Sequence, residues 1–264
     1  MEFFSLFAGG KAPQPLAAAN DVGSGDDGGV VPVNRRAFEH VSQAAHDMHF
    51  AALPGVGARF KELGYTDNDL QRVLEYVETK APLCIHVNFE RNADAFVRDS
   101  HYRNIFEINR TPYSAENPRV DKESKLFNRL YDSAPASERV KYGCLNLFSD
   151  PDGVKRAAQS YGYDFLTLRS SLRQGHVTVT HGNSQSNSAE MLGTLCYFGH
   201  LLTRCSDGEM ADLVRAAGGG QNKSSGADSA GSGGGPGVSS QGHSVTSNGE
   251  LSNYREIQLH CPIR

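Results

Sequence analysis

Polar and apolar residues alternate along the segment Tyr254–His260 and on to Cys261. The apolar positions are Ile257, Leu259 and Cys261, and the polar positions are Glu256, Gln258 and His260. A period of two residues is typical of a half-buried strand. Two interpretations are open at this point. The segment is either an ordinary edge strand with a polar outer face, or a strand that holds a carboxylate rigidly in a cleft.

The front of the chain has apolar residues at helical spacing instead. This spacing predicts helices over 35–50 and 58–63, interrupted at Pro54. Thr66 is a good N-cap for a third helix, which should continue to about residue 80. We therefore expect residues 34–82 to form a helical subdomain that packs on the rest of the protein and carries no chemistry of its own.

Strand-like patterns begin at residue 83 and mark a second region, 83–264. Strands are expected over 83–89, 140–148, 161–168 and 176–180, with an extended segment over 102–109. Helices are expected over 121–132, 187–202 and 207–218, the last one capped by Asp207. Together with the C-terminal strand, these elements predict an α+β fold with a mixed or antiparallel sheet.

Two segments are too polar to build a core. Residues 218–253 consist largely of Gly and Ser, which predicts a disordered insert with an end-to-end distance of roughly 30–35 Å. Because a strand follows this tether, we expect that strand to insert into a sheet built by distant residues. Residues 1–33 are also expected to be disordered, as a plain flexible terminus or as an unstructured export signal of bacterial injection systems.

Composition narrows the function classes. The chain has 264 residues and a net charge of −4, which argues against nucleic acid or an anionic membrane as the main partner. No apolar run approaches the roughly 20 residues of a membrane span. The five cysteines include no CxxC pair, so we expect reduced thiols and no metal site.

Three pairs of polar residues are expected to converge in one cleft. They are His86 with Asn88, Tyr142 with Asn146, and Glu256 with Gln258, with Arg91, Arg103, Arg110 and Arg139 nearby. Arginine pairs with phosphate and aromatic rings stack on flat bases, so this set suits a pyrophosphate ligand that carries a ring. Each pair also has an ordinary structural interpretation, and a strand histidine is more often a structural residue than a catalytic one.

Competing catalytic motifs are absent or weak. The sequence has no GxGxxG between a strand and a helix, no GxxxxGK[ST] and no GxSxG. A nucleophilic Cys–His pair is a further alternative, because Cys84 or Cys144 could contact a histidine. The apolar surroundings of both cysteines argue against an activated thiolate.

Five blocks of the sequence resemble CteC-type bacterial effectors, a family of ADP-ribosyltransferases. They are Val87-Asn88-Phe89, Tyr102-Arg103 through Phe106-Glu107, Glu123 to Phe127 with Tyr131-Asp132, Lys141 to Asn146, and Tyr254-x-Glu256-x-Gln258-x-His260. The resemblance covers residues 83–181 and 254–263, about half the chain. It departs at Tyr161-Gly162-Tyr163, where the family has a Gly-Ser pair, and at Ile108 to Thr111, where the family has a Thr-Gly-rich turn.

The resemblance implies a mono-ADP-ribosyltransferase fold, a split sheet that binds NAD as co-substrate between its halves. Glu256 would stabilise the positive charge that forms as nicotinamide leaves, and Tyr254 would recognise the acceptor. The NAD contacts that the resemblance and the polar pattern suggest are His86, Asn88, Arg91, Arg103, Phe106, Asn109, Arg110, Tyr142, Asn146 and Gln258.

The resemblance also implies a biological role. The protein would be a monomeric bacterial effector, a virulence toxin secreted into the host cytosol. There it would transfer ADP-ribose to a threonine of host ubiquitin and so block ubiquitination. Two alternatives stay open. One is an NAD glycohydrolase, in which water is the acceptor, and the other is a non-catalytic module that binds host protein.

Overall fold

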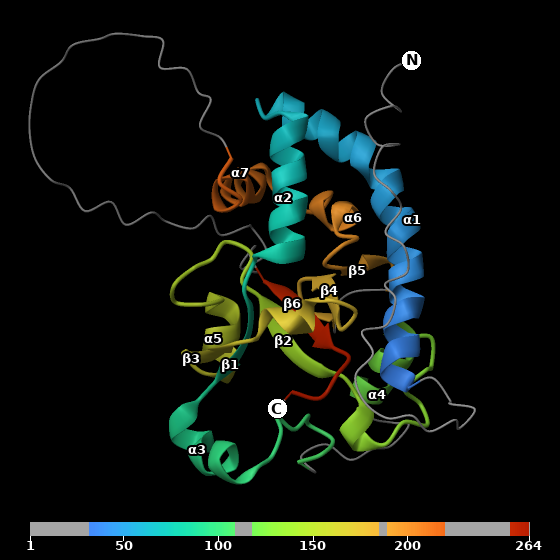
Figure 1. The fold of residues 1–264 in the computed structure, drawn as a ribbon, viewed down its shortest axis with the longest axis vertical. Coiled ribbons are helices and arrows are strands. Elements are labelled where there is room, and N and C mark those ends of the chain that lie inside the picture. The colour runs from blue at the N-terminus through green and yellow to red at the C-terminus, as the bar shows by residue number, and fades with distance from the viewer. Residues whose placement is uncertain (1–31, 109–117, 185–188, 220–253, 264) are drawn as a thin grey trace, which may run out of the picture. The chain divides into compact units, whose positions relative to one another are not determined.

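The structure combines a helical N-terminal region with a six-stranded sheet (Figure 1). The computed structural model describes residues 32–108, 118–184, 189–219 and 254–263. The helices are α1 (Val33–Glu62), α2 (Asp67–Thr79), α3 (Phe89–Arg98), α4 (Pro118–Leu126), α5 (Lys155–Tyr161), α6 (Gly199–Leu202) and α7 (Asp207–Ala216). The strands are β1 (Leu83–Val87), β2 (Lys141–Leu145), β3 (Asp164–Thr167), β4 (Val177–His181), β5 (Leu192–Thr194) and β6 (Arg255–Leu259).

The sheet is open and antiparallel, in the order β3-β1-β2-β6-β4-β5. Its most C-terminal strand, β6, lies between β2 and β4, as the red arrow of Figure 1 shows. The prediction that the last strand inserts between distant residues is therefore confirmed, and the edge-strand interpretation is wrong. We expected a sheet split into halves, whereas the six described strands pair in one continuous order.

Helices cover one face of this sheet and bury the main core. Ile257 and Leu259 of β6 point into that core and meet side chains from α1, α2, α6 and α7. The alternation predicted for β6 is thus confirmed for its apolar side. A smaller apolar cluster lies apart from the main core and consists of Cys84, Cys144, Val154, Ala157 and Tyr254. Helices α1 and α2 belong to one compact unit with the sheet, Pro32–Arg264.

The break predicted in the first helix is wrong, because α1 continues through Pro54 to Glu62. Proline removes one backbone hydrogen bond and costs about 3 kcal/mol inside a helix. The buried side of α1 nevertheless continues past it with Leu53, Val56 and Phe60. Burial of each such side chain contributes about 1.5–3 kcal/mol, which offsets the cost of proline.

The helix predicted after Thr66 is confirmed as α2. The Thr66 hydroxyl accepts a hydrogen bond from the Asp69 amide at 3.2 Å, and the Thr66 amide donates to the Asp69 carboxylate at 2.9 Å. This reciprocal capping box is a local signal, which explains why the sequence identifies it. The cap of α7 is the neighbour of the predicted one, since Ser206 and not Asp207 accepts the amide hydrogen bond from Glu209.

Two extended segments are shorter than predicted or differently built. Strand β1 ends at Val87, because Asn88 leaves the strand and caps α3. The described part of 102–109 contains turns and no strand. Its turn is stabilised by Asn104, whose side-chain oxygen accepts hydrogen bonds from the amides of Phe106 and Glu107 at 2.9 and 3.0 Å. Asparagine often stabilises turns in this way.

Three other elements begin or end away from their predicted positions. Strand β3 begins at Asp164, because Gly162, with φ of 129°, ends the unpredicted helix α5. Helix α4 ends at Leu126, before the left-handed residues Asn128 and Arg129. The continuous helix predicted over 187–202 is wrong where it is described, since β5 pairs with β4 there and only the 3-10 turn Ala189–Met191 and α6 are helical.

The remaining strand predictions over 140–148 and 176–180 correspond to β2 and β4. Several predictions lie outside the described residues: those for residues 1–31 and 220–253, and the roles of Asn109 and Arg110. No described helix combines the length and apolar character that crossing a membrane requires.

Candidate functional site

A cavity of about 240 Å³ opens on the sheet face that carries Glu256. Glu256 lies in the central strand β6, opposite Cys144 of β2 and Thr180 of β4. Only 6% of Glu256 is exposed. The other residues that line the cavity are Ile85, His86, Tyr102, Arg103, Asn104, Ile105, Ile108, Arg119, Tyr142, Gly143, Cys144, Ala157, Tyr161 and Tyr254. The cavity thus holds one carboxylate among four tyrosines and two arginines.

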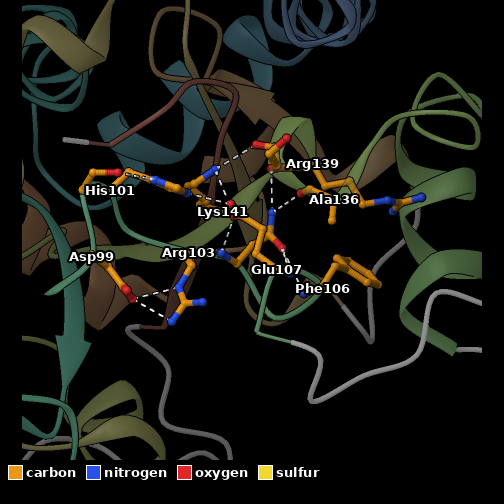
Figure 2. Close-up of polar contacts among 11 residues, drawn as sticks. Asp99, His101, Arg103, Phe106, Glu107, Ala136, Arg139 and Lys141 are labelled. Carbon is orange, nitrogen blue, oxygen red and sulfur yellow. Dashed lines mark hydrogen bonds and ion pairs between the residues drawn. The ribbon is translucent and has the colours of Figure 1, made fainter. Parts of the chain in front are cut away.

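One wall of the cavity is the segment that follows α3, and a polar network holds it in place (Figure 2). The Asn104 amide donates to the Glu107 carboxylate at 2.8 Å, and His101 Nε2 lies 2.7 Å from the same carboxylate. Lys141 of β2 lies 3.7 Å from it. Figure 2 also shows Arg103 turned toward Asp99, with which it forms an ion pair at 2.7 Å.

The environment of Glu256 shifts its titration to higher pH. Burial raises the pKa of Glu256 above its ordinary value, while hydrogen bonds from Ser184 and Gln258 and the charge of Arg119 oppose the rise. The Gln258 side-chain amide donates to Glu256 at 3.3 Å, and the Tyr254 hydroxyl donates at 3.4 Å. Both contacts are long for hydrogen bonds, so they compensate the desolvated carboxylate only in part.

A chain of buried hydrogen bonds orients Gln258, and through it Glu256. The Thr178 hydroxyl donates to the Gln258 side-chain oxygen at 2.9 Å and lies 3.0 Å from His260 Nε2. Burial lowers the pKa of His260 to about 3, so its ring is neutral at pH 7. His260 Nδ1 lies 2.8 Å from the Tyr131 hydroxyl, which in turn donates to the Asn34 side-chain oxygen at 2.7 Å.

Two tyrosines of the cavity stay protonated. Burial raises the pKa of Tyr254, and the negative charge of Glu256 raises it further. Burial likewise raises the pKa of Tyr142, whose hydroxyl donates to Glu123 at 2.9 Å. The Arg119 guanidinium lies 4.8 Å from the centre of the Tyr142 ring, a cation–π contact. The cavity therefore presents neutral rings and hydroxyl donors beside one carboxylate.

Five of the predicted site residues line the cavity together, and the other predicted residues that the structure describes do not. The five are His86, Arg103, Tyr142, Tyr254 and Glu256. Gln258 supports Glu256 from within the hydrogen-bond chain, with no exposed surface. Arg91 lies in α3 and is not part of the lining.

Three further predicted contacts have structural partners instead. The Asn88 side chain accepts from the Arg91 amide at 2.9 Å and caps α3. Asn146 holds a turn, because its side-chain oxygen accepts from the Asp150 amide at 3.0 Å. Phe106 is buried, and the Arg139 guanidinium lies 4.7 Å from its ring centre.

His86 lines the cavity, but both of its ring nitrogens face backbone groups. Nδ1 lies 3.0 Å from the carbonyl oxygen of Gly162, and Nε2 accepts from the amide of Val154 at 2.9 Å. This pattern requires a neutral ring that donates through Nδ1. The ordinary structural interpretation of this strand histidine therefore fits its contacts better than a ligand role.

Sequence reasoning missed four residues that shape the site. Arg119, Tyr102 and Tyr161 line the cavity, and Ser184 hydrogen-bonds to Glu256. None of them lies within a strand, so no alternation marks them.

No family model matches the sequence, and no curated protein matches it significantly.

Proposed function

We propose that the protein is an NAD-dependent mono-ADP-ribosyltransferase that modifies a threonine of ubiquitin. The observation that carries the proposal is the buried carboxylate of Glu256, the one carboxylate among the described residues that line the cavity, fixed in a central strand beside tyrosines and arginines. The sequence blocks that resemble the effector family add the acceptor and the role as a secreted bacterial effector in the host cytosol.

The chemistry rests on the charge of Glu256. Cleavage of the bond between nicotinamide and ribose builds positive charge on the ribose carbon. A fixed carboxylate stabilises such a charge strongly, because the buried site has a low dielectric and needs little reorganisation. Glu256 in its ionised form can also accept the proton of the acceptor hydroxyl. The raised pKa of Glu256 makes it a better base than an exposed glutamate.

The cavity suits one end of NAD. Its volume of about 240 Å³ is below the roughly 300–1,000 Å³ of sites that enclose a drug-sized ligand. We therefore place only the nicotinamide riboside in it, with the ring against Tyr142 or Tyr161. Arg119 and Arg103 would hold the pyrophosphate, and Arg103 would then share its charge between phosphate and Asp99.

The test uses labelled NAD and purified ubiquitin. Wild-type protein should label ubiquitin, and mass spectrometry should place the ADP-ribose on a threonine. Glu256→Gln should lose the labelling, whereas Glu75→Gln, which changes an exposed carboxylate of α2, should retain it. An unlabelled ubiquitin, or equal labelling by the Glu256 variant, contradicts the proposal.

The same reaction separates the alternatives. Because Glu256 is 6% exposed, water reaches it more easily than a side chain of a folded protein does. Nicotinamide release without any labelled protein would therefore select an NAD glycohydrolase. A non-catalytic interaction module would release no nicotinamide, and NAD would not raise its melting temperature.

A further inference from the structure

Two cysteines face each other on neighbouring strands beside the cavity. Cys84 of β1 and Cys144 of β2 are register partners, and their sulfur atoms are 3.4 Å apart. Both are buried, and they pack with Tyr254 in one apolar cluster. Cys144 lines the cavity and is also the register partner of Glu256. The pair therefore joins the floor of the cavity to the next strand.

The spacing of this pair suits a disulfide. Directly opposed residues of antiparallel strands have Cα atoms about 4.5–5.5 Å apart, within the roughly 4.4–6.8 Å that disulfides span. The bond length is about 2.0 Å, so the two sulfur atoms must approach by somewhat more than 1 Å. Rotation of the two side chains supplies such a movement without a shift of the strands.

The two thiols differ in acidity, as a reacting pair requires. The hydrogen bond with Cys144 lowers the pKa of Cys84 below that of an ordinary thiol. The hydrogen bond with Cys84 raises the pKa of Cys144, which keeps its proton. The thiolate is the nucleophile in thiol oxidation, and the cavity beside Cys144 gives a small oxidant a path to the pair.

A metal ion fits these residues less well. His86 completes a cluster with the two cysteines, and the possible ligand atoms lie within 4.8 Å of one another. The ring nitrogens of His86, however, face the Gly162 carbonyl and the Val154 amide. Two thiols alone remain, and a structural zinc site takes four protein ligands.

We propose that Cys84 and Cys144 are a redox modification site that closes to a reversible disulfide under a peroxide. The Cys84 thiolate attacks one peroxide oxygen, and the other oxygen leaves as water after protonation. Cys144 then loses its proton and attacks the resulting sulfenic sulfur, which releases a second water. In total, two thiols are oxidised and one hydrogen peroxide is reduced. A dithiol such as dithiothreitol returns both cysteines to the reduced state.

The disulfide draws the Cys144 side chain toward β1 and away from Tyr254 and Glu256. A displacement on the order of 1 Å at a catalytic position can cost about 100-fold in rate. We therefore expect oxidation to lower nicotinamide release by about tenfold or more. This second part rests on the proposed function, whereas formation of the disulfide does not.

The experiment treats the full chain with hydrogen peroxide, blocks the remaining thiols after unfolding and maps the peptides by mass spectrometry. We expect a peptide pair joined through Cys84 and Cys144, lighter by two hydrogens and released by dithiothreitol. Recovery of both cysteines as blocked thiols overturns the modification site, as does oxidation confined to the exposed Cys196. This map needs wild-type protein only and does not depend on the folding of a variant.

Activity decides whether the site controls the cavity. Nicotinamide release by wild type and by Cys196→Ser should fall on oxidation and recover on reduction. Release by Cys84→Ala should not respond. An unchanged rate in protein shown to carry the disulfide overturns the regulation of activity by this disulfide. If no nicotinamide is released in either state, the proposed function fails, and the peptide map alone still decides the modification site.

Discussion

Replacement of Glu256 by glutamine should remove activity and stabilise the protein at the same time. The side chain is 6% exposed, and its hydrogen bonds from Gln258 and Tyr254 are 3.3 and 3.4 Å long. A buried carboxylate with such contacts keeps part of its desolvation cost, and glutamine has the same shape without the charge. A single stabilising substitution commonly contributes about 0.5–2 kcal/mol.

The size of the effect on melting follows from the size of the domain. A change of 1 kcal/mol shifts the melting temperature by about 2–4 °C in a domain of roughly 150–250 residues. We therefore expect Glu256→Gln to melt a few degrees above wild type at pH 7 and to lose about 100- to 1,000-fold in nicotinamide release, as losses of one electrostatic group do. Differential scanning calorimetry and a nicotinamide assay measure the two quantities.

The stability gain should depend on pH in a defined direction. Because the folded pKa of Glu256 is raised, its contribution to wild-type stability is full below the ordinary value of 4.5 and is lost as pH rises through the folded pKa. The glutamine variant has no such loss, so its advantage should grow from acid to neutral pH. Glu75→Gln should match wild type throughout. A Glu256→Gln protein that is less stable at pH 7, or equally active, refutes the reasoning.

Three further changes test the supports of the site. Glu209→Gln removes the negative charge that lies 2.9 Å from the buried Arg255 guanidinium, and should cost about 3–5 kcal/mol by urea unfolding. An unchanged urea midpoint would show that the Glu209–Arg255 ion pair does not stabilise the fold. Thr178→Val breaks the hydrogen-bond chain and should lower nicotinamide release about tenfold, the effect of roughly 1.4 kcal/mol. Thr167→Val, at an exposed threonine, is the control. Equal rates for wild type and Thr178→Val would show that the hydrogen-bond chain does not support catalysis. Asn88→Ala removes the cap of α3 and should cost about 1 kcal/mol without weakening NAD binding, measured by calorimetry.

Local patterns predicted the parts of the fold that depend on neighbours in sequence. The alternation around Glu256 gave the strand and its two faces, and Thr66 with Asp69 gave the start of α2. The helix break predicted at Pro54 was wrong, because the free-energy cost of proline is local, whereas the burial that offsets this cost comes from contacts with distant elements. The continuation of α1 through Pro54 thus depends on packing contacts that no short stretch of sequence contains.

Strands carry most of the site residues that were predicted, and the four residues that were missed lie outside the strands. Glu256, Tyr142 and His86 lie within strands β6, β2 and β1, so the alternation of polar and apolar residues marked them. Arg119 lines the cavity from the short helix α4, and Ser184 hydrogen-bonds to Glu256 from outside the strands, and both positions depend on tertiary contacts. The role of His86 also escaped the sequence, because the backbone groups of Gly162 and Val154 are invisible to side-chain patterns.

The central claim is that Glu256 cleaves NAD in this cavity. The most direct measurement is the initial rate of nicotinamide release from NAD by the purified full chain, with and without ubiquitin, for wild type, Glu256→Gln and Glu75→Gln. We predict release by wild type that ubiquitin accelerates, equal release by Glu75→Gln, and a rate at least about 100-fold lower for Glu256→Gln. No release by wild type, or a Glu256→Gln rate equal to it, would contradict the account.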